Sequence, residues 1–163
     1  MVDIVFPVVD FRWIMFPGFD EQWIPTKGSP LSSGFDLYAA EYICIPRCSW
    51  APIRHRIGIE LPPPSETDGW VIEAQVRSRS GLAYKHGLQV LNSPGTVDND
   101  YRGELITILA NHGPTDYWVR AGDRISQLVV VAIPNCIELQ AGVDHDKVSV
   151  TDRGTDGFGS TGR

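Results

Sequence analysis

Residues 71–76 read VIEAQV, and this segment decides whether the chain is interpreted as helical or as β-structure. It is too short for its hydrophobic period to separate a helix from a strand. Its length, its β-branched side chains and the turn-forming residues on both sides favour a strand. The segment therefore predicts a β-strand in the middle of the chain.

Similar runs of β-branched and aromatic residues recur along the sequence, separated by turns formed from 16 glycines and 12 prolines. These runs are residues 42–45, 57–61, 70–76, 88–91, 105–109 and 125–133. Many short strands with frequent turn signals predict an all-β sandwich or barrel. One helical turn is expected over residues 81–86, where better helix formers gather.

The composition predicts one globular domain. The chain has 163 residues, of which 42% are hydrophobic and 21% are charged, and this length suffices for a sizeable core. The net charge of −6 argues against a general binder of nucleic acid or of membrane surfaces, because both require a basic face. A small anionic ligand is still compatible with this charge, since a few arginines in one pocket are enough.

The cysteines and the N-terminus indicate a cytosolic setting. Three cysteines without a CxxC spacing argue against a disulfide framework and against a zinc site, so we expect reduced, mostly buried thiols. The opening MVDIVFPVVDF carries aspartates and no basic region, which is a poor signal peptide. No apolar run approaches the length of a membrane span.

Two polar segments are candidates for anion and metal chemistry. In SSGFDLYAA, residues 32–40, Asp36 lies at the start of a strand, where its carboxylate either holds a divalent cation or belongs to a turn. In RSRSGLA, residues 77–83, arginines alternate with serines before a glycine. Arginine offers a bidentate fork to phosphate oxygens, and a helix beginning at Gly81 would add free amides. The alternative is a polar turn with solvated arginines.

Two further segments carry candidate polar residues. VLNSPGTVDNDYRGEL, residues 90–105, contains a turn signal at residues 93–95 and predicts a β-hairpin. Asp98 and Asp100 would share one face of an extended strand, so that one of them could act as a general base; the alternative is a polar loop. In AGDRISQLVV, residues 121–130, Gln127 either contacts a ligand or satisfies backbone groups on a strand.

The C-terminal segment RGTDGFGSTG, residues 153–162, is rich in glycine and is compatible either with an anion-binding arm or with a disordered polar terminus. Phe158 lies between Gly157 and Gly159, which suits a ring that folds over a planar ligand. The segment is not a Walker loop, because it lacks the GxxxxGK[ST] spacing.

Taken together and in this order, GFDLYAA, RSGLA, TVDNDYRGEL, GDRISQL and RGTDGFGSTG resemble the five motifs of the trimeric dUTPases. The resemblance runs from about residue 30 to the C-terminus. It implies a distorted jelly-roll-like β-barrel of the β-clip kind over residues 1–147 and a flexible glycine-rich arm over residues 148–163. Within the barrel domain, residues 1–30 hold an N-terminal strand and an unassigned aromatic, proline-rich stretch, and this region is longer than the usual first strand of the family and its connection.

The resemblance also implies a homotrimer whose active sites each combine three subunits, one of which lends its C-terminal arm. Asp98 matches the aspartate that positions the attacking water, and Tyr101 matches the tyrosine that packs on the deoxyribose. Asp36 matches the carboxylate that holds Mg²⁺ through water. The remaining substrate-binding positions implied by the family are Arg79, Ser80, Gly81, Asn92, Gly95, Thr96, Val97, Gln127, Arg153, Phe158, Gly159, Ser160 and Thr161.

The implied activity is hydrolysis of dUTP to dUMP and pyrophosphate with Mg²⁺, in the cytoplasm and without a nucleic-acid or membrane partner. The sequence departs from the family pattern at Asp156, which replaces a glycine, and at Arg77 and Ser78, where many members have Ala-Pro. Three other functions stay open: a dCTP deaminase of the same fold, a nucleotide-gated regulator that binds another protein, and a purely structural jelly roll.

Overall fold

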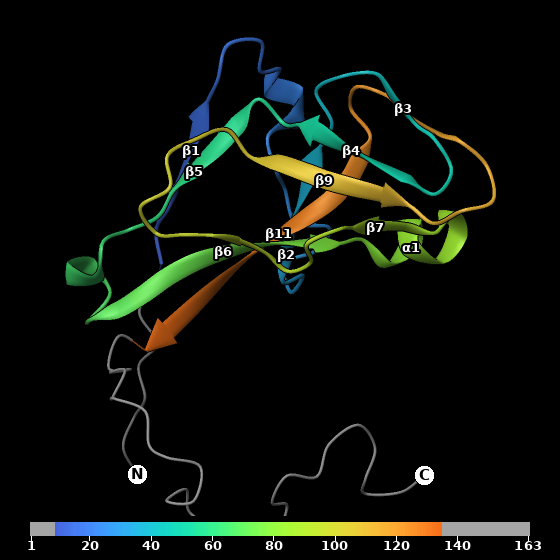
Figure 1. Ribbon diagram of the computed structural model, residues 1–163. Helices are drawn as coiled ribbons and strands as arrows, with labels where there is room; N and C mark the ends of the chain where they lie inside the picture. The colour runs from blue at the N-terminus through green and yellow to red at the C-terminus, as the bar shows by residue number, and fades with distance from the viewer. Residues whose placement is uncertain (1–8, 135–163) are drawn as a thin grey trace, which may run out of the picture.

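The computed structural model describes residues 9–134, which form antiparallel strands and one α-helix (Figure 1). The strands are β1 (Arg12–Met15), β2 (Gly34–Tyr38), β3 (Ile43–Ile45), β4 (Ser49–Arg54), β5 (Ile57–Glu60), β6 (Trp70–Ser78), β7 (Leu88–Val90), β8 (Gly95–Val97), β9 (Ile106–Asn111), β10 (Tyr117–Val119) and β11 (Arg124–Pro134). The helix α1 spans Ser80–His86, and two 3-10 turns span Glu21–Trp23 and Pro64–Glu66. The prediction of an all-β protein is confirmed.

The strands form two main sheets, with strand orders β2-β11-β6-β8 and β4-β9-β7. Two smaller pairs, β1-β5 and β10-β3, extend this arrangement. Figure 1 shows β4 and β9 stacked over β6 and β11, so the two main sheets form the layers of a sandwich. This layered antiparallel arrangement agrees with the predicted jelly-roll-like fold.

Strand β6 confirms the interpretation of residues 71–76. Ile72, Ala74 and Val76 are buried, while the alternate side chains of the strand are only half-buried. This alternation follows from the two-residue period of a strand. Burial of a side chain such as Ile72 contributes about 1.5–3 kcal/mol, so the strand is anchored in the core by one face.

The helix α1 begins and ends where the sequence signals its limits. Arg79 precedes it in an extended conformation, and Gly87 ends it with a φ of 67°. A Cβ at Gly87 would lie 2.8 Å from the backbone nitrogen of Gly113, so only glycine fits at this position. Lys85 and His86 lie in the last turn, where basic side chains complement the helix dipole.

The prediction of a β-hairpin over residues 90–105 is correct only in part. The apolar runs on either side of this segment do pair antiparallel, as β7 and β9, with Val90 opposite Leu109. The turn at residues 93–95 itself does not close a hairpin, because β8, which follows it, pairs with β6 of the other main sheet. Asp98 and Asp100 also do not share a strand face, because β8 ends at Val97 and a turn follows.

The aromatic N-terminal stretch packs on the barrel. The rings of Phe11, Trp13 and Phe35 meet edge to face at centroid distances of 5.3–5.8 Å. Phe11, Trp13 and Phe19 also contact the buried core. This stretch therefore covers part of the hydrophobic core of its own chain.

Two further observations bear on the predicted setting. Cys48 is exposed and Cys44 is partly buried, so the expectation of mostly buried thiols is wrong for these two residues. Both are free thiols, and Cys136 lies outside the described residues.

Over residues 9–134, no helix has the length and apolar character needed to cross a membrane.

Candidate active site

A cavity of about 520 Å³ opens beside the N-terminal end of α1. Its size lies within the range of small-molecule sites. Four separate segments line it: the loop before β2, β2 itself, α1 with the residue before it, and β11. The lining residues are Gly28, Ser32, Gly34, Asp36, Arg79, Ser80, Gly81, Leu82, Lys85, His86, Arg124 and Gln127. We call this cavity the phosphate pocket.

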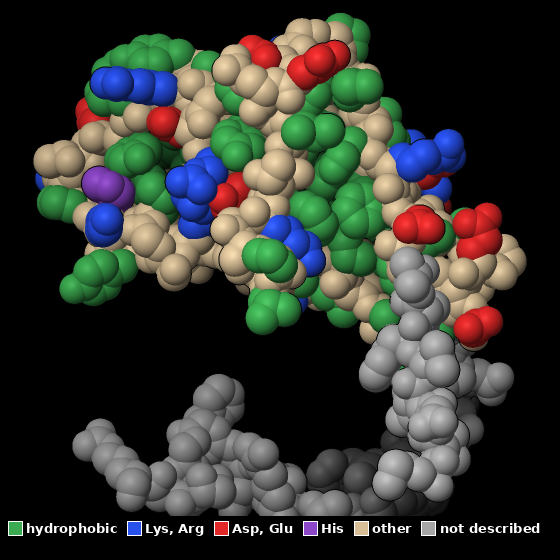
Figure 2. Space-filling view, turned by 180° about the vertical axis from the view of Figure 1, so that it is seen from behind, with side chains coloured by type: hydrophobic (Ala, Val, Ile, Leu, Met, Phe, Trp, Pro, Cys, Tyr) green, Lys and Arg blue, Asp and Glu red, His purple; other side chains and the backbone are tan. Residues whose placement is uncertain are grey.

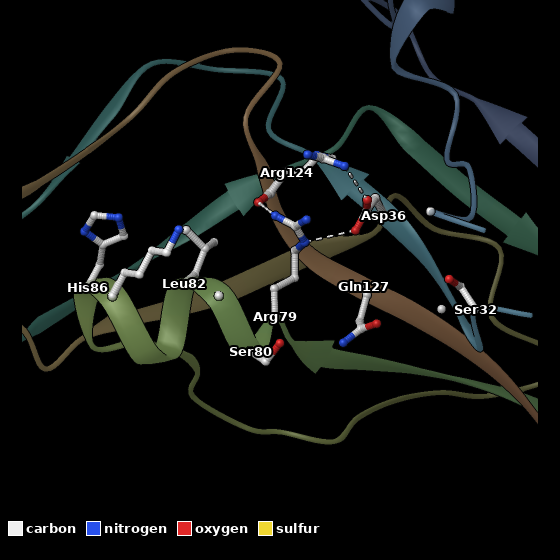
Figure 3. Close-up of a pocket in the computed structure, with 12 residues that line it drawn as sticks. Ser32, Asp36, Arg79, Ser80, Leu82, His86, Arg124 and Gln127 are labelled. Atoms are coloured by element: carbon white, nitrogen blue, oxygen red, sulfur yellow. Dashed lines mark hydrogen bonds and ion pairs between the residues drawn. The ribbon is translucent and has the colours of Figure 1, made fainter.

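Two arginines hold one carboxylate in the middle of the phosphate pocket (Figure 3). Arg79 Nε lies 2.9 Å from Asp36 Oδ1, and Arg124 Nη1 lies 3.1 Å from Asp36 Oδ2. Arg79 Nη1 also donates to the backbone oxygen of Arg124 at 2.8 Å. The side chain of Asp36 is 15% exposed, whereas that of Arg124 is 51% exposed. The carboxylate is thus enclosed by cations that still face solvent.

The position of Arg124 follows from an irregularity in β11. The register of β11 against β2 shifts between Arg124 and Ser126, and beyond the shift Gln127 lies opposite Asp36. Such a bulge turns side chains that would otherwise alternate strictly between faces. Gln127 is fixed because its Nε2 donates to the backbone oxygen of Ser78 at 2.9 Å. β11 thereby presents both Arg124 and Gln127 to the phosphate pocket.

The charge of the phosphate pocket is positive. Arg79, Lys85 and Arg124 line it together with one carboxylate, Asp36, and Figure 2 shows basic side chains gathered around an acidic one on this face. This local excess contrasts with the net charge of −6 for the whole chain. Guanidinium groups suit phosphate oxygens because their donors form a planar fork. The pocket can therefore accept a polyanion.

Asp36 could hold Mg²⁺ only if a bound phosphate supplied further ligands to the ion. Within residues 9–134, no group of three or more His, Cys, Asp or Glu side chains could hold a metal. Mg²⁺ typically takes one or two carboxylates, keeps several waters and obtains its other ligands from substrate phosphates. A single carboxylate beside a phosphate-binding pocket matches this pattern.

A second, smaller cavity of about 170 Å³ lies at the turn between β8 and β9. Its lining residues are Val76, Asn92, Gly95, Thr96, Val97, Asp98, Tyr101, Glu104, Leu105 and Ile106. We call it the nucleoside pocket, after the role that the family resemblance implies for its residues. It combines apolar walls with an aromatic ring and an exposed carboxylate, Asp98. It shares no lining residue with the phosphate pocket.

The turn that carries Asp98 and Tyr101 is fixed by its own neighbours. Asn99 Nδ2 donates to the backbone oxygens of Pro62 at 2.8 Å and Ile72 at 2.9 Å. The hydroxyl of Tyr101 donates to the backbone oxygen of Glu104 at 2.9 Å. Although these residues lie outside regular strands, hydrogen bonds from side chains to the backbone hold them in place.

A buried polar chain connects the two sheets behind the phosphate pocket. His55 Nδ1 lies 2.7 Å from the backbone oxygen of Tyr38, and His55 Nε2 lies 2.7 Å from Thr107 Oγ1. Thr107 Oγ1 lies 2.7 Å from Ser126 Oγ. Because a carbonyl only accepts, Nδ1 carries the proton; Nε2 of a neutral ring then accepts from Thr107, and Thr107 accepts from Ser126.

Burial lowers the pKa of His55 from its ordinary value of 6.5 to about 4, although the Tyr38 carbonyl and the charges of Glu104 and Glu41 act in the opposite direction. The ring is therefore neutral at pH 7, which is the state for which the hydrogen-bond directions above hold. This chain ends at Ser126, next to Gln127, and at Tyr38, which follows β2 residues Asp36 and Leu37. It ties together the two strands that carry the polar groups of the phosphate pocket.

The structure distributes the predicted residues over the two pockets. The phosphate pocket contains Asp36, Arg79, Ser80, Gly81 and Gln127. The nucleoside pocket contains Asn92, Gly95, Thr96, Val97, Asp98 and Tyr101. The arm residues Arg153, Phe158, Gly159, Ser160 and Thr161 lie outside the described residues, as does Asp156.

Sequence reasoning missed Arg124, Lys85 and Glu104, which also line these pockets. Arg124 follows Gly122-Asp123 and is typical of a solvated turn. Only its place in a strand register beside Asp36 marks it as part of the site. Lys85 could have been found from the sequence, because it lies four residues after Gly81 and therefore on the same face of the expected helix.

Comparisons with known proteins give the family and the fold of the chain. The family model described as dUTPase matches residues 20–162. A deoxyuridine 5'-triphosphate nucleotidohydrolase from Anaplasma marginale is 42% identical over 144 residues, covering 85% of this chain and 88% of that protein.

Two solved structures share the fold. A dUTPase of Staphylococcus bacteriophage 80alpha with dUPNHPP matches with a TM-score of 0.76 at 21% identity, covering 94% of this chain and 99% of that chain. A dUTPase from phage phi11 of S. aureus, described with the coordination of a structural Mg(II) ion, matches with a TM-score of 0.67 at 19% identity, covering 85% of this chain and 99% of that chain. Since the family model spans most of the sequence and the Anaplasma marginale relative matches at 42% identity, the chain belongs to the dUTPase family.

Proposed function

We propose that this protein hydrolyses dUTP to dUMP and pyrophosphate, by in-line attack of water on the α-phosphorus. The observation that supports this most directly is the basic phosphate pocket, in which Arg79, Arg124 and Gln127 surround one carboxylate. In a member of the dUTPase family, a pocket of this charge suits a triphosphate. Hydrolysis of dUTP keeps uracil out of DNA and supplies dUMP for dTMP synthesis.

In this proposal, Arg79, Ser80 and Gln127 orient the triphosphate, and Lys85 and Arg124 add positive charge. Fixed donors directed at the leaving phosphates stabilise the negative charge that grows there in the transition state. Asp36 would hold Mg²⁺ through water, and the ion would neutralise part of the charge on the leaving group. The amides around Gly81 lie at the mouth of the same pocket.

The nucleoside pocket supplies the base-binding and catalytic residues. Asp98 accepts a proton from the attacking water, a role that typically contributes about 10²–10⁴-fold to the rate. The ring of Tyr101 packs against the deoxyribose and leaves no space for a 2′-hydroxyl. Asn92 and the backbone of residues 95–97 bind uracil, where the amino group of cytosine would place a donor against a donor.

The two pockets share no residue, so we propose that a second copy completes each site within a homotrimer. Water activated by Asp98 must reach a phosphorus held by Arg79, and an intact site therefore needs both pockets at one place. Leu91 and Ile106 beside the nucleoside pocket are 48% and 42% exposed, which suits a face covered by a neighbour.

The C-terminal arm completes the proposal. Residues 148–163 would close over the nucleotide of a neighbouring copy, with Arg153, Ser160 and Thr161 on the phosphates and with Phe158 and Gly159 at the base. The barrel domain would span residues 1–147. A cytoplasmic location, where the nucleotide pool is accessible, and independence of nucleic-acid and membrane partners belong to the same proposal.

The test is release of pyrophosphate from dUTP with Mg²⁺, measured beside UTP, dTTP and dCTP. Selective hydrolysis of dUTP is expected, and Asp98→Asn should lower kcat by about 10²–10⁴-fold. Asp100→Asn is the matched control, because Asp100 is an exposed carboxylate two positions away that does not line the nucleoside pocket. Ammonia release from dCTP would indicate the deaminase instead, and no turnover of any nucleotide would contradict the proposal.

A further inference from the structure

Glu104 is a carboxylate with no role in the proposed chemistry, yet it is almost fully enclosed beside the nucleoside pocket. Its side chain is only 10% exposed. Arg54 Nη1 lies 2.6 Å from Oε2, and the backbone nitrogen of Arg56 donates to Oε1 at 2.9 Å. Arg56 Nη1 lies 3.8 Å from Oε2. Each carboxylate oxygen thus has a donor, which a buried charge requires.

The backbone of Arg56 is shaped for this contact. Its φ is 54°, in the left-handed region that residues with a side chain rarely adopt. Its amide donates to Glu104 instead of continuing a strand ladder. Residues held in sparsely populated conformations gather at functional sites, because the surrounding structure must impose the conformation. The contact with Glu104 is therefore a specific feature of this connection between β4 and β5.

The backbone of Glu104 fixes the aromatic wall of the nucleoside pocket. Its carbonyl oxygen accepts the hydroxyl of Tyr101 at 2.9 Å. The ring of Tyr101 also lies directly over Gly103, where a Cβ would overlap the hydroxyl and the adjoining ring carbons. The ring is held by its hydroxyl and lies against Gly103 at that end. Its place in the pocket therefore depends on where the backbone of Glu104 lies.

These contacts form one continuous path from Arg54 and Arg56 through Glu104 to Tyr101. We propose that Glu104, clamped by these two arginines, is a positioning residue that sets Tyr101 against the sugar and so determines the preference for deoxyribose over ribose. The inference rests on the proposed dUTP hydrolysis. The ring of Tyr101 excludes a 2′-hydroxyl only if its position is accurate to a fraction of the size of that hydroxyl. A displaced ring leaves room for ribose.

A structural role alone would predict a different result. The contacts of Glu104 with Arg54 and Arg56 could serve only to join the β4–β5 connection to residue 104. Their loss would then lower the stability of the protein and reduce its activity on all nucleotides by one common factor. A positioning role predicts that the two sugars respond unequally. The ratio of kcat/KM for dUTP to kcat/KM for UTP separates the two roles, because a common loss cancels in this ratio.

The experiment compares Glu104→Gln with the wild type on dUTP and on UTP. Glutamine keeps the size of the side chain and one acceptor for Arg56, but it removes the charge that holds Arg54. The expected result is a fall of about tenfold in the ratio, through a loss of kcat/KM on dUTP that UTP does not share. Glu60→Gln is the matched control, because Glu60 pairs with Arg12 at 2.8 Å on the β1–β5 pair and lines neither pocket. It should leave the ratio unchanged.

A second variant covers the case in which Glu104→Gln does not fold. Arg54 is 48% exposed, so Arg54→Met should fold and still release the carboxylate, whereas Arg54→Lys should restore part of the ratio. An unchanged ratio in folded Glu104→Gln and Arg54→Met would overturn the positioning role while dUTP hydrolysis stands. A wild type that fails to hydrolyse dUTP would instead overturn the proposed function and this inference with it.

Discussion

Arg79 and Asp36 form an ion pair in which Nε lies 2.9 Å from Oδ1, and Arg124 holds the other oxygen of the same carboxylate at 3.1 Å. A residue assigned to phosphate and the residue assigned to magnesium therefore neutralise each other. When a triphosphate enters, the arginines face a new anion. Mg²⁺ beside Asp36 would then balance the carboxylate that the arginines release.

Asp36→Asn should consequently have opposite effects on the affinity for a dUTP analogue in the absence and in the presence of magnesium. In EDTA, the variant should bind the analogue dUpNHpp more tightly than the wild type, since its arginines no longer share their charge with a carboxylate. With Mg²⁺, the gain in affinity that the ion provides should fall by at least about tenfold, as expected for a residue that contacts a metal through water. Isothermal titration calorimetry measures both affinities.

The control for this variant is Asp116→Asn. Asp116 is exposed and accepts from the backbone nitrogen of Arg47 near β10, away from both pockets. It should bind dUpNHpp like the wild type under both conditions. Equal weakening of Asp36→Asn with and without Mg²⁺ would contradict the exchange of partners and assign Asp36 a structural role.

Complementation between two inactive variants tests the shared site. Arg79→Ala damages the phosphate pocket, and Asp98→Asn damages the nucleoside pocket. In trimers assembled from an equal mixture, about a quarter of the sites would combine two intact pockets from different chains. Refolding the two variants together should therefore restore activity that neither shows alone. If each site lay within one chain, every site would keep a defect and the mixture would stay inactive.

Gly103→Ala should disturb sugar selection without touching a charged group. A Cβ at residue 103 overlaps the hydroxyl of Tyr101 and must push the ring from its place, which breaks the hydrogen bond to Glu104. Activity on dUTP should fall and the preference over UTP should narrow. Tyr101→Phe serves as the comparison: it removes the hydroxyl but keeps the ring, so its effect should be smaller. A larger effect in Tyr101→Phe would argue against ring displacement.

The buried ring of His55 should make the fold sensitive to mild acid. The unfolded chain takes up a proton at this residue near pH 6.5, whereas the folded chain does so only near pH 4. Stability is thus unaffected above pH 6.5 and falls as the pH decreases towards 4. The loss should reach about 3 kcal/mol, because each pH unit contributes about 1.4 kcal/mol. Urea unfolding between pH 7 and pH 4 measures it.

His55→Asn is the variant for this measurement. It should be less stable than the wild type at pH 7, since Thr107 loses its acceptor, but its stability should decrease less steeply below pH 6.5. His112→Asn provides the control, as His112 is exposed. It should keep the slope of the wild type, and an equal slope in all three proteins would rule out His55 as the source.

Local sequence patterns located β3, β5, β6, β7, β9 and β11, missed β4 and β10, and did not determine how the strands pair. The β-branched runs at residues 57–61 and 125–133 became β5 and β11, because alternation and burial are local properties of a strand. The turn at residues 93–95 was also visible. β7 pairs with β9 beyond that turn, as the two apolar runs suggest, whereas β8 pairs with β6, a partner that no local pattern identifies.

The residues of the candidate site likewise include some that the sequence identifies and some that only the folded structure identifies. Residues within the motifs, such as Arg79 and Gln127, could be named from the sequence, and they do line one pocket. Arg124 and Glu104 could not be singled out, since a charged side chain in a turn is usually solvated. Their importance depends on a strand register and on a contact between Glu104 and Arg56, which are far apart in the sequence, and both exist only after folding.

The polar chain of His55, Thr107 and Ser126 has a consequence for how this sequence can change over generations. Each member satisfies the next, so an apolar replacement of one leaves a buried partner without its hydrogen bond, at a cost of about 1–3 kcal/mol. Replacing all three with apolar side chains of matching volume removes most of that cost, because only the Tyr38 carbonyl then lacks the donor that His55 supplied. The three positions are therefore epistatic: they are expected to be inherited together, and a lineage that loses one must soon lose the others.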